Sequence, residues 1–210
     1  MRFNCTCKKI DFQKKSFTYW EDRLTTSDEK LIIKKIYNKL NNKKKILHVG
    51  IGNSELGLKM AKLNNVTGIT ISNNEIKFAK SLQIKNYEVL YCDKYSYNFK
   101  TIFKNQKFNL IIDNNLKSYA CCENAFKFYM ENLFKILSKK GSLITSKKGM
   151  GWYKQLKPKL SFNFKKFFHY KMKEIQGNRN NILKISELKK ICSTYGIKLS
   201  FDNKLCYLTK

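Results

Sequence analysis

The stretch Ile46-Leu-His-Val-Gly-Ile-Gly-Asn-Ser-Glu-Leu-Gly57 decides how this chain folds. Its first four residues form a short apolar run that predicts a buried strand, and the run ends at Gly50. Residues 54–64 then carry apolar side chains at helical spacing, so the sequence predicts a helix directly after the glycines. A strand, a glycine turn and a helix in that order allow a ligand to approach the backbone closely and favour an anionic group at the helix start.

The spacing of the glycines tests whether this turn is the dinucleotide-binding turn of dehydrogenases. Gly50 and Gly52 fit either kind, but the next glycine is Gly57, which does not match the dinucleotide fingerprint of dehydrogenases. This spacing counts against a nicotinamide-dependent dehydrogenase. Taken alone, the turn leaves open the alternative of a plain tight turn without a ligand.

Strand and helix patterns alternate from residue 46 to residue 146. The predicted strands cover residues 46–49, 66–71, 87–91, 108–112 and 142–146. The predicted helices of this region cover residues 54–64, 72–82 and 120–137. Capping-box pairs predict the start of the helix at 72, with Ser72 and Glu75, and of an earlier helix over 27–40, with Thr26 and Glu29. Such alternation is typical of a mostly parallel sheet with helices on both faces.

The C-terminal segment follows a different pattern. A helix is predicted over 185–195, and strands over 197–201 and 205–209 flank a turn at Asp202-Asn203. Strands joined by so short a turn must be antiparallel. We therefore expect a doubly wound α/β fold with a mostly parallel, seven-stranded sheet whose last strand is antiparallel.

The chain is expected to form a single domain with four parts. These are an N-terminal arm and helix (1–45), a core (46–146), a basic aromatic insert (147–181), and a last helix with a β-hairpin (182–210). From Lys147 to Lys173 the insert has nine lysines, seven aromatic residues and no acidic residue. Such a segment can stack bases and hold phosphates, cover an acceptor site, or bind an anionic lipid surface or a phosphorylated small molecule. A solvated pair of amphipathic helices is the alternative.

The formal net charge of the chain is +28, from 43 basic and 15 acidic residues. A field of this strength attracts nucleic acid, anionic membrane surfaces and acidic small molecules. The lysines are spread over almost every segment, and the chain is also rich in Asn, Ile, Tyr and Phe. Because A+T-rich coding DNA produces the same composition, the charge is either functional or incidental.

The seven cysteines are odd in number and follow no disulfide framework, and the N-terminus lacks an apolar signal region. These features predict a reducing, cytoplasmic setting. No metal site is expected, because Cys5 and Cys7 lack a second pair at zinc spacing. No stretch approaches the ~20 apolar residues of a membrane span, so no integral membrane segment is expected.

Further motifs stand at the ends of the predicted strands. They are Val66-Thr-Gly-Ile-Thr-Ile-Ser-Asn-Asn-Glu75, Tyr91-Cys-Asp93, Phe108-Asn-Leu-Ile-Ile-Asp113 and Gly141-Ser-Leu-Ile-Thr145. Together with the glycine turn, this set resembles the class I S-adenosylmethionine-dependent methyltransferases over residues 45–146. The segment 66–72 is most similar to the cyclopropane fatty acid synthase branch, but the Glu-His pair that this branch carries after its fourth strand is absent here.

The resemblance implies S-adenosylmethionine as the cofactor and assigns its binding residues by position. Gly50, Ile51, Gly52 and Asn53 would line the methionine end, and Thr70 and Ile71 would meet the ribose and adenine. Asp93 would accept a hydrogen bond from the adenine amino group, with Lys94 beside it. His48 and Thr70 stand where most members have an acid, so His48 serves as a neutral hydrogen-bonding group or marks weakened binding. Tyr19 and Trp20 are candidates for a lid over the cofactor or for packing of the N-terminal arm.

On the acceptor side, the resemblance places Asp113 and Asn114 near the sulfonium and the acceptor. A general base is needed only if the acceptor must lose a proton. The candidates for this base are Asp113, Tyr119, Glu123 and His169, of which Tyr119 and Glu123 also fit ordinary helix-start residues. Cys121-Cys122 is either a reactive thiol pair or two small buried hydrophobic residues.

The sequence leaves three candidate functions. The first is methyl transfer to a small molecule, anionic or otherwise, and the second is methyl transfer to RNA or DNA through the basic aromatic insert. Against the second, the fourth strand does not end in an Asn/Asp-Pro-Pro-Tyr motif. The third is a cofactor-binding or scaffold protein that kept the fold without turnover. The sequence does not predict the acceptor or the oligomeric state.

Overall fold

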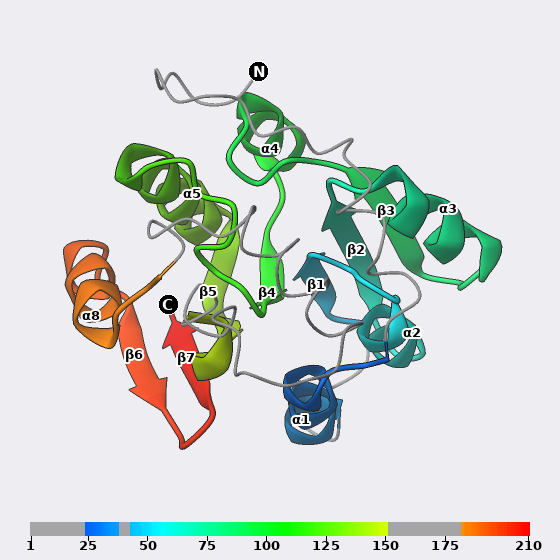
Figure 1. Ribbon diagram of the computed structural model, residues 1–210, viewed down its shortest axis with the longest axis horizontal. Coiled ribbons are helices and arrows are strands. Elements are labelled where there is room, and N and C mark those ends of the chain that lie inside the picture. The colour runs from blue at the N-terminus through cyan, green and yellow to red at the C-terminus, as the bar shows by residue number, and fades with distance from the viewer. Residues whose placement is uncertain (1–23, 38–42, 151–181) are drawn as a thin grey trace, which may run out of the picture.

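The computed structural model describes residues 24–37, 43–150 and 182–210. Its strands form one seven-stranded sheet in the order β3-β2-β1-β4-β5-β7-β6 (Figure 1). The strands are β1 (Lys45–Val49), β2 (Asn65–Thr70), β3 (Tyr87–Tyr91), β4 (Phe108–Asp113), β5 (Leu137–Ser146), β6 (Lys198–Phe201) and β7 (Leu205–Thr209). The helices are α1 (Ser27–Ile36), α2 (Glu55–Ala61), α3 (Asn73–Ser81), α4 (Tyr97–Phe103), α5 (Glu123–Ile136), α6 (Lys147–Met150) and α8 (Ile185–Thr194).

The strand pairing confirms the predicted sheet. Strand β1 pairs in parallel with β2 on one side and β4 on the other, while β7 runs antiparallel to both β5 and β6. The strand order reverses at β1, because β2 and β3 extend to one side and β4 and β5 to the other. In open α/β sheets such a reversal is the place where a crevice forms at the carboxyl ends of the strands.

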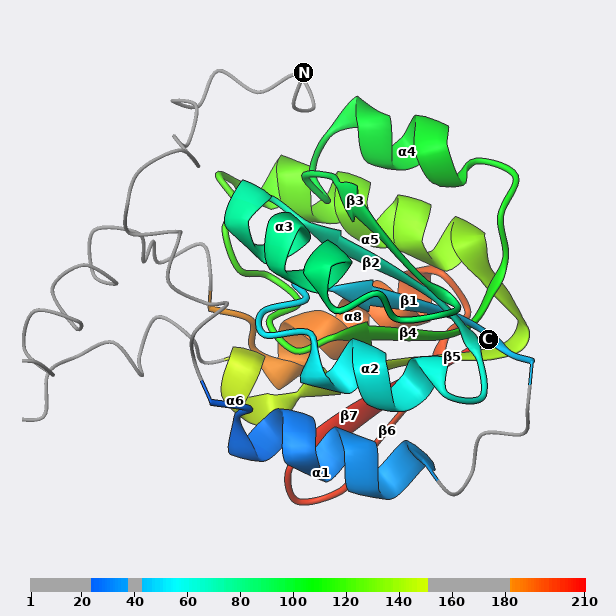
Figure 2. The ribbon, with the colours of Figure 1, turned by 90° about the vertical axis from the view of Figure 1, so that its right-hand side faces the viewer.

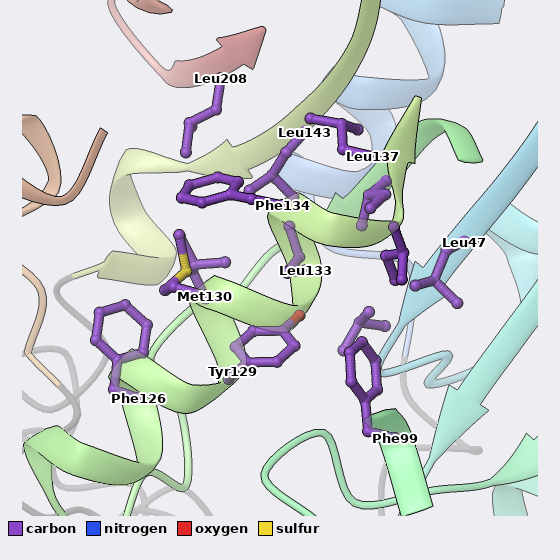
Figure 3. Packing of buried hydrophobic residues seen from close by; sticks show 14 of the residues in the cluster. Leu47, Phe99, Phe126, Tyr129, Met130, Leu133, Phe134, Leu137, Leu143 and Leu208 are labelled. Carbon is purple, nitrogen blue, oxygen red and sulfur yellow. The ribbon is translucent and has the colours of Figure 1, made fainter. Parts of the chain in front are cut away.

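Helices cover both faces of the sheet (Figure 2). On one face, α1 and α2 bury Ile32, Leu56 and Met60 against β1 and β4. On the other face, α4, α5 and α8 close a larger core. Figure 3 shows this core, in which one side of α5 packs against Leu47 of β1 and Phe99 of α4.

The capping residues behave differently at the two predicted helix starts. At α1 both halves of the capping box form. The Thr26 hydroxyl accepts from the backbone N–H of Glu29, and the Glu29 carboxylate accepts from the backbone N–H of Thr26. At α3, Ser72 accepts from the backbone N–H of Glu75, but the Glu75 carboxylate accepts from the Thr70 hydroxyl instead. The second predicted box is therefore half formed, and its acid is directed to the end of β2.

Several elements differ from the prediction, among them one missed helix and the bounds of β5 and α2. Helix α4 was missed because Tyr97-Asn-Phe-Lys-Thr-Ile-Phe103 is rich in strand-forming residues, and burial of Phe99 and Phe103 overrides that preference. Strand β5 begins at Leu137 rather than at 142, with a register shift opposite Phe108–Leu110. Helix α2 ends at Ala61, three residues before the predicted end.

The chain leaves the sheet after α6 and returns before α8 at nearly the same place. The backbone N–H of Leu183 donates to the carbonyl oxygen of Met150 at 2.8 Å. Tyr19, Trp20, His169 and residues 151–181 of the insert lie outside the described residues. Within the described ranges, no helix is long and apolar enough to cross a membrane.

Candidate functional site

A cavity of about 300 Å³ lies at the carboxyl ends of β1, β2, β3 and β4, where the strand order reverses. The start of α1 and the residues that follow β5 complete its wall. Its lining includes Asp28, Glu29, Gly50, Gly52, Thr70, Glu75, Asp93, Lys94, Asp113, Asn114, Ser118, Tyr119, Lys148 and Gly149.

The glycine turn forms the floor of this cavity. Gly50, Gly52 and Ser54 all have positive φ angles, of 76°, 52° and 61°, so every second residue of the turn is left-handed. The backbone N–H of Gly50 donates to Ile69 of β2, and the Asn53 amide donates to the hydroxyl of Thr25 just before α1. A Cβ atom on Gly50 would meet nothing within 4 Å. The turn is therefore fixed from two sides and leaves open space above Gly50.

The end of β2 acquires a carboxylate from the next helix. The Thr70 hydroxyl donates to Glu75 at 2.5 Å, and the backbone N–H of Ser72 donates to the same hydroxyl at 3.1 Å. Glu75 is 4% exposed and lines the cavity. The acid that Thr70 lacks is thus supplied from the first turn of α3. Sequence reasoning missed this role because it treated Glu75 as the capping partner of Ser72.

The cavity is acidic although the chain is strongly basic. Among the residues that the structure describes, five acidic side chains line it, against two basic ones, Lys94 and Lys148. The five acids are Asp28, Glu29, Glu75, Asp93 and Asp113. The formal charge of the lining is therefore −3 in a chain whose formal charge is +28. Such a cavity attracts a ligand that carries positive charge.

A buried ion pair lies in the wall of the cavity. The ammonium of Lys94 lies 2.8 Å from Asp113 Oδ2, and the Tyr129 hydroxyl donates to the same oxygen at 2.8 Å. Asp113 Oδ1 accepts from the backbone N–H of Asn115. Burial lowers the pKa of Lys94 and raises the pKa of Tyr129 well above its usual value, and Asp113 opposes the first shift and adds to the second. The buried Asp113 carboxylate is therefore held by three donors.

The structure brings together most of the residues that the sequence singled out. Gly50, Gly52, Thr70, Ile71, Asp93, Lys94, Asp113, Asn114 and Tyr119 all line the same cavity. Three others lie outside its lining. His48 is buried on β1, Ile51 packs beneath the turn against Ala79 and Val89, and Asn53 tethers the turn to Thr25.

Sequence reasoning also missed the contribution of α1. Asp28 and Glu29 reach the cavity from the first turn of this helix, and Ser146 at the end of β5 donates to Asp28 at 2.6 Å. The signal available was the capping pattern at Thr26, which explains these acids locally. Their position in the cavity lining depends on where α1 packs, which the local sequence does not show. Among the described residues, no group of three or more His, Cys, Asp or Glu side chains is arranged to hold a metal ion.

Gly149 lets two backbone segments meet at the wall of the cavity. A Cβ atom there would overlap the carbonyl oxygen of Asn114. We expect Gly149→Ala to lower the free energy of unfolding by about 2–3 kcal/mol, because the segments after β4 and β5 must separate. Urea unfolding measures this change.

The control for this prediction is Gly196→Ala. Gly196, unlike Gly149, has a positive φ, of 64°, and a Cβ atom there meets nothing within 4 Å, so only backbone strain of about 1–2 kcal/mol is added. A Gly149→Ala protein as stable as the Gly196→Ala protein would contradict the close approach to Asn114.

The fold and the cavity define an α/β protein of the nucleotide-binding type, with its crevice at the strand reversal. A family model described as a methyltransferase domain matches residues 40–191. The chain belongs to this methyltransferase family. No curated protein sequence matches the chain.

Solved structures share the fold at low sequence identity. A TehB-like SAM-dependent methyltransferase from Corynebacterium glutamicum matches with a TM-score of 0.58 and 14% identity, covering 90% of each chain. A putative caffeoyl-CoA O-methyltransferase from Staphylococcus aureus matches with a TM-score of 0.57 and 15% identity, covering 90% of this chain and 85% of the other. A SAM-dependent methyltransferase from Aquifex aeolicus matches with a TM-score of 0.53 and 14% identity, covering 87% of this chain and 88% of the other.

Proposed function

We propose that this protein transfers the methyl group of S-adenosylmethionine to a small-molecule acceptor. The observation that carries the proposal is the acidic cavity in a chain with a formal charge of +28. S-adenosylmethionine bears a sulfonium and an ammonium group, so carboxylates around it lower its electrostatic energy.

Different residues of the cavity bind the methionine, ribose and adenine parts of the cofactor. The open space above Gly50 and Gly52 accommodates the methionine end, with Asp28 and Glu29 as acidic neighbours for its ammonium group. Thr70 and Glu75 take the ribose, because a carboxylate accepts hydrogen bonds from hydroxyl groups. Asp93 accepts from the adenine amino group. This arrangement makes His48 a buried neighbour of the turn rather than the substitute for the missing acid.

The cofactor supplies an activated methyl group when it is bound, so the protein mainly has to align the reactants and exclude water. Alignment of this kind contributes on the order of 7–11 kcal/mol in favourable cases. Asp113 acts as a fixed negative charge, because both of its oxygens are already held by donors. Asn114 and Ser118 face the acceptor, and Tyr119 is the candidate to take a proton from it.

Calorimetric titration of the whole protein with S-adenosylmethionine and S-adenosylhomocysteine tests this function. We expect both ligands to bind with micromolar dissociation constants that change little between low and moderate salt. If neither ligand binds at millimolar concentration, the proposal fails.

A titration with single-stranded RNA separates the nucleic-acid alternative. Most of the basic residues in the described part of the chain lie outside the cavity, and binding of RNA through them would weaken steeply with salt. RNA that binds tightly at moderate salt and accepts methyl groups would replace the small-molecule acceptor. Cofactor binding without turnover on any acceptor would favour a binding protein.

A further inference from the structure

The acceptor side of the cavity is formed by the segment between β4 and α5. This segment, here called the acceptor loop, comprises residues 114–122 and contributes Asn114, Asn115, Ser118 and Tyr119 to the lining. Tyr119 has a positive φ of 61°, so the loop holds a strained backbone at the residue nearest to α5 that lines the cavity. Such a conformation persists only where surrounding contacts fix it.

Those contacts come from the two residues that follow Asp93. The ammonium of Lys94 donates to the carbonyl oxygens of Asn115 and Leu116 at 2.9 and 3.1 Å, in addition to its bond with Asp113. An ammonium group has three donors, so all of them are used within the protein. The neighbouring hydroxyl of Tyr95 donates to the carbonyl oxygen of Ser118 at 2.7 Å. Three loop carbonyls are therefore held from one short segment.

The same segment is tied to a cavity residue on its other side. The Asp93 carboxylate accepts from the backbone N–H of Tyr95 at 3.0 Å, and the Asp93 carbonyl accepts from the Ser96 hydroxyl at 2.7 Å. Lys94 and Tyr95 are buried, with 8% and 1% exposure, so water does not replace these bonds. A continuous hydrogen-bonded path thus runs from Asp93 to the acceptor loop.

We propose that Lys94 and Tyr95 are positioning residues that couple occupation of the cofactor site at Asp93 to the order of the acceptor loop. This proposal rests on the proposed function, in that the ligand at Asp93 is the adenosyl cofactor. Lys94 has no donor left for a ligand, which places it behind the site rather than in contact with the cofactor. Because coupling is reciprocal, a ligand that binds better when the loop is ordered must itself favour the ordered loop, by the same factor.

The test is Tyr95→Phe, which removes one hydroxyl and keeps the ring. The matched control is Tyr207→Phe, because the Tyr207 hydroxyl donates to Asp202 in the β6–β7 hairpin, away from the cavity. Amide hydrogen exchange of residues 114–122 is followed by mass spectrometry with and without S-adenosylhomocysteine, and the affinity for that ligand is measured by calorimetry.

We expect loop amides of ligand-free Tyr95→Phe to exchange about five- to tenfold faster than wild type, as loss of one buried hydrogen bond predicts. We also expect S-adenosylhomocysteine to slow loop exchange in wild type and to slow it less in Tyr95→Phe, while Tyr207→Phe matches wild type in both. Unchanged loop exchange would overturn the proposal, as would acceleration spread evenly over the core strands. Equal slowing of loop exchange by the ligand in Tyr95→Phe and in wild type would overturn the coupling.

A failure of the proposed function gives a different result. If wild type does not bind S-adenosylhomocysteine, the cofactor assignment fails and the coupling fails with it. Loop exchange in ligand-free Tyr95→Phe still decides whether Tyr95 holds the loop.

Discussion

Gly50→Arg is expected to lower the affinity for S-adenosylhomocysteine at least 100-fold. Gly50 lines the cavity at a φ of 76°, and the first side-chain atom would enter open space. A long side chain therefore grows into the volume that the methionine end needs and adds a positive charge beside the carboxylates. The backbone strain costs about 1–2 kcal/mol and leaves the fold in place. Calorimetric titration gives the affinity, and circular dichroism checks the fold.

The matched control is Gly196→Arg. Gly196 has a similar φ of 64° and equally open space at its Cβ position, but it lies at the end of α8 and does not line the cavity. It should show the same strain and unchanged affinity. If Gly50→Arg binds the ligand as wild type does, the cofactor does not occupy the space above the glycine turn.

Lys94→Met is expected to lower the free energy of unfolding by about 3–5 kcal/mol. The substitution leaves Asp113 at 2% exposure without its cation, and a buried charge that loses its partner is strongly destabilising. It also removes the donors to Asn115 and Leu116. Chemical unfolding monitored by fluorescence measures the loss.

Two further variants show where this loss comes from. Lys135→Met breaks an exposed ion pair with Glu131 and should change stability by less than about 1 kcal/mol. Adding Asp113→Asn to Lys94→Met removes the stranded charge, so the double variant should be more stable than Lys94→Met alone. A loss below 1 kcal/mol for Lys94→Met would mean that Asp113 is not held as an ion pair.

Much of the fold was predictable because strand patterns and turns are local. The bounds of β3 and β7 coincide with the predicted runs, and the start of α1 follows from its capping box. Helix α4 was not predictable, because its helical state depends on burial of Phe99 and Phe103 against distant residues. Local pattern therefore predicted the elements whose packing and sequence preferences agree.

The site was predictable only where its residues end a strand or form a turn. Gly50, Thr70, Asp93 and Asp113 stand at such positions, and all of them line the cavity. Asp28 and Glu75 do not, since each belongs to a helix start whose local role explains its presence. They line the cavity because of how α1 and α3 pack on the sheet, and a local sequence pattern does not predict that packing. Likewise, the three bonds of Lys94 join segments that are about twenty residues apart.

The hydrogen bond between Leu183 and Met150 has a consequence for the modularity of this protein. Because the chain departs and returns at adjacent points, a segment of almost any length can be carried between them without stretching the sheet. Loop-closure entropy rises only by about 0.6 kcal/mol for each doubling of length. The seven-stranded sheet therefore sets no particular length for the segment between residues 150 and 183.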